Sequence, residues 1–217
     1  ARRPPRASFT ALLAAAAAVA GALVAMGLVF DAGPLSARMA LHLVVMNVVA
    51  PLVAALLSLL LAKGVTGWNR LWAFATLQMA LLWAWHVPRL ADADNLASQT
   101  VLLLVLLCVA TGFWMAVAGA GQARRWGAVG ALLVTGKLAC LLGGLLLFAP
   151  RDLYGLPAMV FALCAVGPSS LEDQQLAGMM MLVACPLSYV MAAVVLTVDA
   201  VGATAPDAPR SRLPERR

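Results

Sequence analysis

Charged residues are scarce in this chain. Asp, Glu, Lys and Arg together make up 11% of the 217 residues, whereas 64% are hydrophobic. A soluble domain carries about 25% charged residues. The mean hydropathy is +0.95, and so much apolar surface must face lipid, because a soluble core of this size could not bury it. The composition therefore excludes a soluble globular domain and predicts an integral membrane protein.

Long polar stretches are also missing, so nothing divides the chain into two halves and we expect one compact membrane domain. The net charge of +6 raises the question of nucleic-acid binding. The basic residues lie in short clusters between apolar segments and form no continuous stripe. This pattern predicts no nucleic-acid partner and instead resembles the charge distribution of membrane loops.

The sequence lacks the common catalytic motifs. It contains no nucleotide-binding loop, no HExxH, no GxSxG and no paired CxxC, which argues against a self-sufficient enzyme. Cysteines are few and occur in apolar stretches, at Cys108, Cys140, Cys164 and Cys185. We interpret them as small buried hydrophobic residues, with disulfides as the less favoured alternative.

Long apolar segments are abundant. About 20 apolar residues are needed to cross the hydrocarbon core as a helix, and six segments qualify. We therefore predict an all-α, polytopic membrane helical bundle with about six transmembrane helices, at Ser8 to Phe30, Ala37 to Ala62, Arg70 to Val87, Leu96 to Ala120, Trp126 to Phe148 and Gln174 to Val198. The apolar run from Leu156 to Val166 contains Pro157 and is too short to span, so we expect a re-entrant or interfacial segment.

The distribution of basic residues predicts the orientation. Eleven of the fifteen Lys and Arg residues fall on the side of the two termini, and three fall on the other side. Because cytoplasmic loops are enriched in Lys and Arg, both termini are predicted to be cytoplasmic. We expect a basic cytoplasmic N-terminus at residues 1–7, a single transmembrane domain at residues 8–200, and a disordered basic cytoplasmic tail at residues 201–217.

The second apolar segment carries a candidate metal site. Met39, His42 and Met46 are spaced i, i+3 and i+7, which places them on one face of a helix. Thioether and imidazole groups are ligands that suit Cu(I). The alternative is a packing face lined by methionine with one hydrogen-bonded histidine.

The second histidine, His86, follows Trp83 and Trp85 at the end of the third segment, where an interfacial anchor is the alternative interpretation. In the predicted topology His42, His86 and Asp173 lie at similar depth on the outer side, which favours a shared site. Asp173 also stands three residues after Ser170, so a helix-capping role for these two residues is possible.

Lys137 lies near the middle of the fifth segment. A charged side chain there is costly and needs a partner, water or neutralisation, and such a residue marks a functional site by default. Asn47 and Gln78 lie at comparable depth and are possible partners, and Cys108 and Cys140 are possible neighbours. A structural hydrogen bond between helices is an equally good interpretation.

Three motifs in order resemble the CtaG-type (caa3-type) family, which is associated with cytochrome c oxidase assembly. They are Met39-Ala40-Leu41-His42-Leu43-Val44-Val45-Met46 with Ala50-Pro51-Leu52, then Trp85-His86-Val87-Pro88 followed by Phe113-Trp114, then Leu171-Glu172-Asp173-Gln174-Gln175-Leu176-Ala177-Gly178. The resemblance covers residues 36–190. It departs from the family pattern at Arg38 and at Ala97-Ser98-Gln99-Thr100, where family members commonly carry histidine.

The resemblance implies an assembly factor for a haem–copper terminal oxidase in a bacterial inner membrane. It implies that copper, as Cu(I), binds His42 and His86 near the periplasmic face, with Met39 or Met46 as soft ligands and Asp173 orienting a histidine. Oxidase subunits and membrane lipids are the expected partners, and no turnover is expected. The missing histidines favour the alternative of a metal-free accessory subunit of a respiratory oxidase. Haem ligation by the two histidines and transport rank lower.

Overall fold

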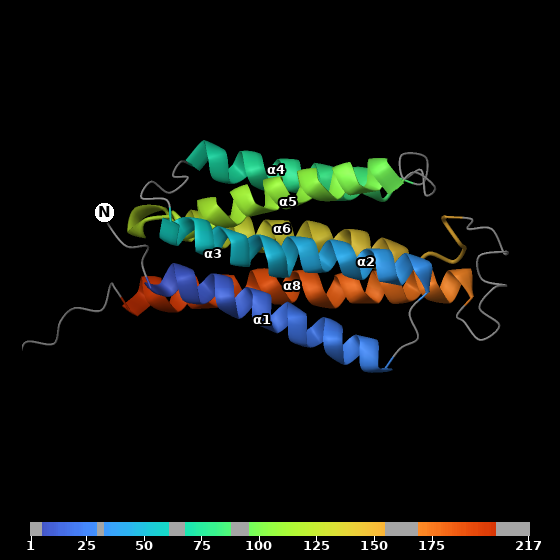
Figure 1. Cartoon of the computed structure of the whole chain (residues 1–217). Helices are drawn as coiled ribbons and strands as arrows, with labels where there is room; N and C mark the ends of the chain where they lie inside the picture. Colours follow the sequence, from blue (N-terminus) through green and yellow to red (C-terminus); the bar gives the residue numbers. More distant parts are fainter. Residues whose placement is uncertain (1–5, 30–32, 61–67, 88–95, 155–168, 203–217) are drawn as a thin grey trace, which may run out of the picture.

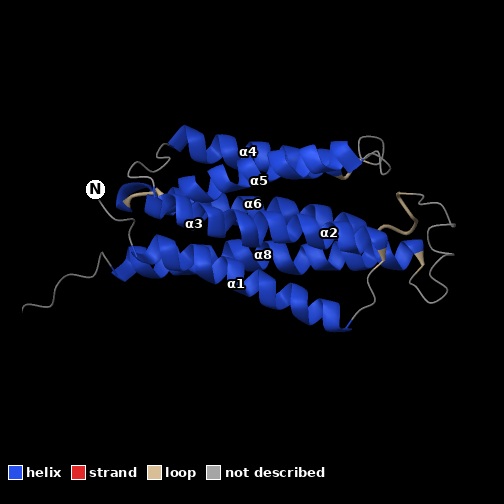
Figure 2. Cartoon of the chain, viewed as in Figure 1, coloured by secondary structure: helices blue, strands red, loops and turns tan. Residues whose placement is uncertain are grey.

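A computed structural model describes residues 6–29, 33–60, 68–87, 96–154 and 169–202. All regular secondary structure within these ranges is helical (Figure 2). Helices satisfy every backbone hydrogen bond within one segment, which is the condition for crossing a membrane that offers no water. The predicted all-α membrane bundle is therefore confirmed.

In the described ranges, six helical rods correspond to the six predicted spans. They are α1 (Arg6–Val29), the continuous α2 (Pro34–Val44), η1 (Val45–Val49) and α3 (Ala50–Leu60), then α4 (Trp68–Trp85), α5 (Leu96–Ala118), α6 (Arg125–Leu147) and α8 (Ser170–Gly202). A short 3₁₀ turn, η2 (Gln122–Arg124), leads into α6. Five rods are long and apolar enough to span a bilayer. The sixth, α4, has 18 residues that include Asn69, Arg70 and Gln78, which lower its hydropathy.

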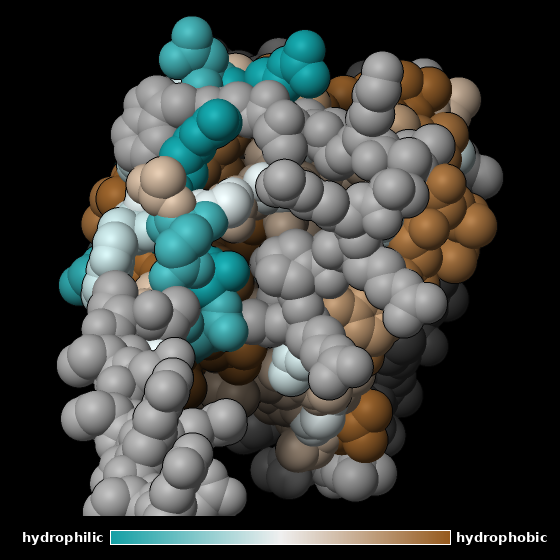
Figure 3. Space-filling model, turned by 90° about the vertical axis from the view of Figure 1, so that its left-hand side faces the viewer, coloured by the Kyte–Doolittle hydropathy of each residue, from teal (hydrophilic) through white to brown (hydrophobic). Residues whose placement is uncertain are grey.

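The rods lie side by side in one bundle (Figure 1). Helix α8 packs against α6, α1 and α2, while α5 packs against α3 and α4. The start of α1 and the end of α8 lie at the same end of the bundle, called here the terminal end. Hydrophilic residues gather on this face (Figure 3). The opposite end holds the start of α2, the end of α6 and the start of α8, and is called here the site end.

Two glycines bring α6 and α8 into close contact. A Cβ atom added to Gly178 would lie 2.6 Å from the Leu147 nitrogen and 2.7 Å from the Gly143 oxygen. A Cβ on Gly143 would lie 3.0 Å from the Gly178 oxygen. Small residues at such positions let membrane helices approach closely enough for backbone contact. This contact fixes α8, which carries Asp173, against α6.

Polar contacts fasten both ends of α8. At the terminal end, the buried Arg125 at the start of α6 pairs with Asp199. At the site end, the Ser169 amide donates to Glu172 at 2.7 Å and the Glu172 amide donates to the Ser169 hydroxyl at 3.3 Å. This is a capping box. The predicted cap at Ser170 and Asp173 is thus wrong by one residue, because the Ser170 hydroxyl bonds Asp152 instead.

Several predictions fall wholly or partly outside the described residues. The segment from Leu156 to Val166, Cys164, and residues 203–217 of the predicted tail are among them. Helix α8 continues to Gly202, two residues into the predicted tail, and α1 begins at Arg6 within the predicted N-terminal segment. The other three cysteines, Cys108, Cys140 and Cys185, are free thiols.

The Gly178 contact leads to a stability prediction. We expect Gly178→Ala to lower the free energy of unfolding by about 1–3 kcal/mol, because the new methyl group would push α6 and α8 apart. Gly21→Ala is the matched control, since a Cβ there meets nothing within 4 Å. Unfolding in mixed micelles, followed by circular dichroism, measures both variants. Equal stability of the two variants would contradict this account of α6–α8 packing.

Candidate metal site

His42 lies on α2, two turns from the start of that helix, and its side chain is 3% exposed. Both ring nitrogens are buried, and neither has a hydrogen-bond partner among the described residues. A buried polar atom without a partner costs about 1–3 kcal/mol, and native proteins rarely leave one unless it serves another purpose. Among the described residues, His42 thus lacks the hydrogen bond that the alternative of a hydrogen-bonded core histidine requires.

His86 directly follows α4 and is held by its own helix. Its Nδ1 lies 2.6 Å from the Leu82 carbonyl oxygen. A neutral imidazole that donates through Nδ1 carries its lone pair on Nε2, and this is the usual arrangement of a metal-binding histidine. The His86 carbonyl also accepts a hydrogen bond from the Tyr154 hydroxyl at 3.3 Å. Burial raises the pKa of Tyr154 to about 12, so this hydroxyl keeps its proton at neutral pH.

The fold brings the two histidines together. Their ring centroids are 6.1 Å apart, with 51° between the ring planes. Imidazole–metal bonds of the zinc type are about 2.0–2.1 Å, so an ion between two imidazoles places their centroids about 6 Å apart. Trp85 closes one side, because its ring meets His42 edge-on at a centroid distance of 4.0 Å. The separation of the two rings thus matches the spacing of two imidazoles that share a metal ion, and Trp85 lies beside His42.

Met39 and Met46 flank His42 along the same rod, and both are buried. Met39 and His42 belong to α2 and keep the expected i, i+3 spacing. Met46 lies in the π-helical turn η1, which changes the helical register after Val44. The common face predicted for all three residues from α-helical spacing therefore applies to Met39 and His42, whereas Met46 is rotated relative to that expectation.

The π turn has an identifiable cause in Pro51. The Ala50 amide donates to the Val45 carbonyl, five residues back. The Met46 carbonyl consequently loses its usual donor, and Pro51 has no N–H to replace it. The Trp114 indole supplies the missing bond, with its Nε1 3.0 Å from the Met46 oxygen. A tryptophan from α5 thus completes the backbone of the helix that carries the candidate ligands.

Asp173 binds backbone groups at the start of α2. Its carboxylate accepts hydrogen bonds from the amides of Gly33 at 3.1 Å, Leu35 at 2.7 Å and Ser36 at 3.0 Å. Asp173 is fully buried, and a Cβ on Gly33 would overlap its carboxylate. His42 lies six residues beyond Ser36, which is about 9 Å along the helix. The described hydrogen bonds of Asp173 thus hold the start of α2, the helix that carries His42, and none of them reaches a histidine ring.

Gln174, the next residue, connects α8 to the second histidine. Its side chain accepts a hydrogen bond from the Leu153 amide at 2.8 Å and donates to the Leu146 carbonyl at 3.2 Å. The loop held in this way presents Tyr154, whose hydroxyl reaches the His86 carbonyl. Asp173 and Gln174 together therefore link both histidine-bearing segments to α8.

The middle of the bundle contains a second group of buried polar residues, which begins about one and a half turns from His42 along its rod. The Asn47 side chain accepts from the Ser188 hydroxyl at 2.8 Å and donates to the Leu43 carbonyl at 3.2 Å. Gln78 donates to the Tyr189 hydroxyl at 2.5 Å. Asn47 and Gln78 therefore form hydrogen bonds with side chains of α8. Neither has a described hydrogen bond to Lys137, whose side chain is exposed.

Sequence reasoning missed Trp114, Gln174 and Tyr154 as parts of this site. Pro51 was the one local signal for Trp114, because a proline inside a span removes a backbone donor that another group must replace. Nothing local indicated Tyr154, whose partner lies 68 residues away. Within the described ranges, no three His, Cys, Asp or Glu side chains converge on a metal position, so a metal here would need methionine sulfur as a further ligand.

Comparison with models of protein families shows which family the chain belongs to. The family model described as cytochrome c oxidase caa3 assembly factor matches residues 1–202. The chain belongs to this family. Searches among curated proteins and among solved structures returned no match. The resemblance drawn from the three motifs is confirmed, and as a caa3 oxidase assembly factor the protein has the multi-pass membrane architecture that its helices show.

The link between Pro51 and Trp114 can be tested by a double-mutant cycle. We expect Trp114→Phe to cost about 1–3 kcal/mol of stability, because it leaves the Met46 carbonyl unsatisfied. Pro51→Ala restores a backbone donor, so the same tryptophan substitution in that background should cost about 1 kcal/mol less. Unfolding in mixed micelles gives the four free energies. Strict additivity would show that the indole does not replace the missing donor.

Proposed function

We propose that this assembly factor binds Cu(I) between His42 and His86 and passes it to a haem–copper oxidase. The observation that carries the proposal is the pair of unpartnered nitrogens on a buried His42, beside a His86 whose Nδ1 is already occupied. Two neutral imidazoles with a neighbouring thioether form a ligand set that suits Cu(I). Met39, one turn before His42, is the first sulfur candidate, and Met46 is the second.

The bundle supports this role by holding the ligands in advance. Asp173 fixes the start of the helix that carries His42, and Tyr154 contacts the backbone of His86. Residues that orient metal ligands from outside typically change metal affinity by about 10–100-fold when they are removed. The copper ion is cargo in this proposal, so the residues bind and release it and catalyse no reaction.

The charge distribution supports a location for the site. Lys and Arg are concentrated in loops at the terminal end of the bundle, which the positive-inside rule assigns to the cytoplasm. The histidines lie toward the other end, which would face the periplasm of a bacterial inner membrane. Copper could then be delivered to an oxidase centre that is assembled from that side.

Copper binding is tested with purified protein in detergent under reducing, oxygen-free conditions. We expect about one Cu(I) per chain for the wild type and none for the His42→Ala, His86→Ala double variant. Met39→Leu should weaken binding by about tenfold or more, as loss of a ligand costs at least as much as loss of an outer contact. Met191→Leu is the matched control, because Met191 is partly exposed on α8 and should leave affinity unchanged.

The outcome separates this proposal from the metal-free alternative. An absence of copper from a folded wild-type protein, or copper retained by the double variant, would overturn copper handling. Co-purification with oxidase subunits in that case would favour an accessory role in the oxidase complex. Matching unfolding curves for wild type and variants would show that any loss of copper is not caused by loss of the fold.

A further inference from the structure

Lys137 lies on a face of α6 that points away from the bundle. Apart from Trp126 in its first turn, the exposed positions of this helix recur every one to four residues, as expected for one helical face, and are Leu133, Val134, Lys137, Leu138, Leu141 and Leu145. Every other member is an aliphatic side chain. A single cation therefore stands in the centre of an apolar surface that faces lipid.

The depth of Lys137 makes its exposure costly. It is twelve residues from the start of α6 and ten from the end, which corresponds to about 18 Å and 15 Å along the axis. A charged residue at the centre of a bilayer costs about 2.5–3.5 kcal/mol on insertion scales. Among the described residues, Arg125 and Asp199 form the ion pair, and Lys137 has neither an ion-pair nor a hydrogen-bond partner. The described part of the chain offers this ammonium group no counter-charge.

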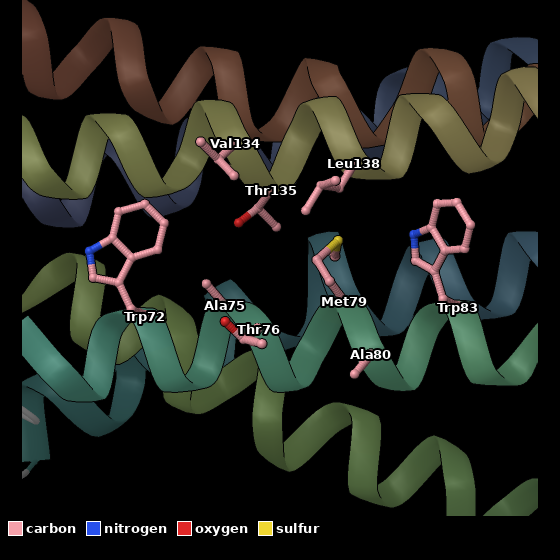
Figure 4. A pocket seen from close by; sticks show the side chains of 9 residues that line it. All are labelled: Trp72, Ala75, Thr76, Met79, Ala80, Trp83, Val134, Thr135 and Leu138. Atoms are coloured by element: carbon pink, nitrogen blue, oxygen red, sulfur yellow. The ribbon is translucent and has the colours of Figure 1, made fainter.

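A groove adjoins this face. A mainly apolar cavity of about 270 Å³ lies between α4 and α6, and its α6 side is formed by the exposed Val134 and Leu138 together with the buried Thr135. On the α4 side, Trp72 and Trp83 stand at opposite ends, and the side chains between them are Ala75, Thr76, Met79 and Ala80 (Figure 4). Val134 and Leu138 belong to the same exposed face as Lys137, so the groove and the cation form one continuous surface.

Glycines leave the same face of α6 open on both sides of Lys137. Gly130 and Gly144 lie seven residues before and after it, which is about two helical turns in each direction. A Cβ added to either glycine would meet no atom within 4 Å. Bare backbone of this kind allows a neighbouring membrane helix to approach closely.

We propose that the α6 face around Lys137, together with the α4–α6 groove, binds a transmembrane helix of a partner protein that carries Asp or Glu at mid-membrane depth. A carboxylate on that helix would pair with the ammonium group in a medium of low dielectric, where charge pairing is strong. Apolar side chains of the partner would fill the groove between the two tryptophans. The proposal rests on the oxidase-assembly part of the proposed function and is independent of copper.

Charge complementarity selects this occupant over two others. All nine Asp and Glu residues of this chain lie near the ends of the predicted spans or between them. A second copy would therefore offer no carboxylate at the depth of Lys137. Lipid phosphates lie at the interface, about 15 Å from the bilayer centre, and cannot pair with a group at this depth. An acidic transmembrane helix satisfies both the charge and the apolar groove.

Site-specific photo-crosslinking tests the proposal in membranes that contain the tagged catalytic subunit of the cognate caa3-type oxidase. The photoreactive residue replaces Leu141, which is 58% exposed beside Lys137, or Leu104 on α5, which is 55% exposed and serves as the matched control. We expect the Leu141 probe to label an oxidase helix that contains Asp or Glu, and the Leu104 probe not to do so. Lys137→Ala should lower the yield about tenfold, whereas Lys137→Arg should preserve it.

The decisive experiment exchanges the charges of Lys137 and of its acidic partner on the oxidase. Lys137→Asp should abolish the adduct, and replacement of the labelled acidic residue of the oxidase by Lys should restore it. Adducts with lipid alone, adducts with a second copy, or an oxidase adduct that is unaffected by Lys137→Ala would each overturn the proposal. Copper content of the Lys137→Ala protein is measured in parallel and should equal that of the wild type, so failure of docking and failure of copper binding give different results.

Discussion

The buried carboxylate of Asp173 is the constraint on which the site end of the bundle depends. It accepts three backbone amides at the start of α2, a position where only a residue without a side chain, Gly33, fits against it. A carboxylate also suits the positive end of the helix dipole. Its neighbour Gln174 holds the loop that brings Tyr154 to His86. Two adjacent residues of α8 thus set the positions of both histidines.

The membrane makes the unsatisfied groups of this protein informative. No water is available inside the bilayer, so backbone and side-chain polar groups must find partners within the chain. Trp114 is an example, because its indole N–H donates to the Met46 carbonyl in place of the N–H that Pro51 lacks. Among the described residues, Gln78 and Arg125 each keep one buried side-chain atom without a hydrogen bond, whereas both ring nitrogens of His42 lack one. Lys137 is exposed without a described counter-charge. We propose that His42 serves as a metal ligand and that Lys137 belongs to a partner surface.

The fold could be predicted from the sequence, because the length of an apolar segment is a strong indicator of a membrane-spanning helix. The six spans predicted in this way agree with the observed helices to within a few residues. The meeting of His42 and His86 was anticipated from depth, although depth cannot show that two helices touch. The partner of Asp173 lies 140 residues away at Gly33, and an acid near a helix start signals capping equally well. Likewise, depth alone could not show whether Lys137 points inward or outward, because α6 is apolar around most of its surface.

Hydrogen–deuterium exchange in lipid nanodiscs tests most directly whether Asp173 positions the helix that carries His42. Asp173→Asn keeps the shape of the side chain but replaces one of the two carboxylate oxygens that accept the three amides by an NH₂ group. Glu172→Gln is the control, because Glu172 is the adjacent residue and is exposed. This account expects faster exchange across residues 33–44 in Asp173→Asn and unchanged exchange there in Glu172→Gln. Unchanged exchange in Asp173→Asn would contradict it.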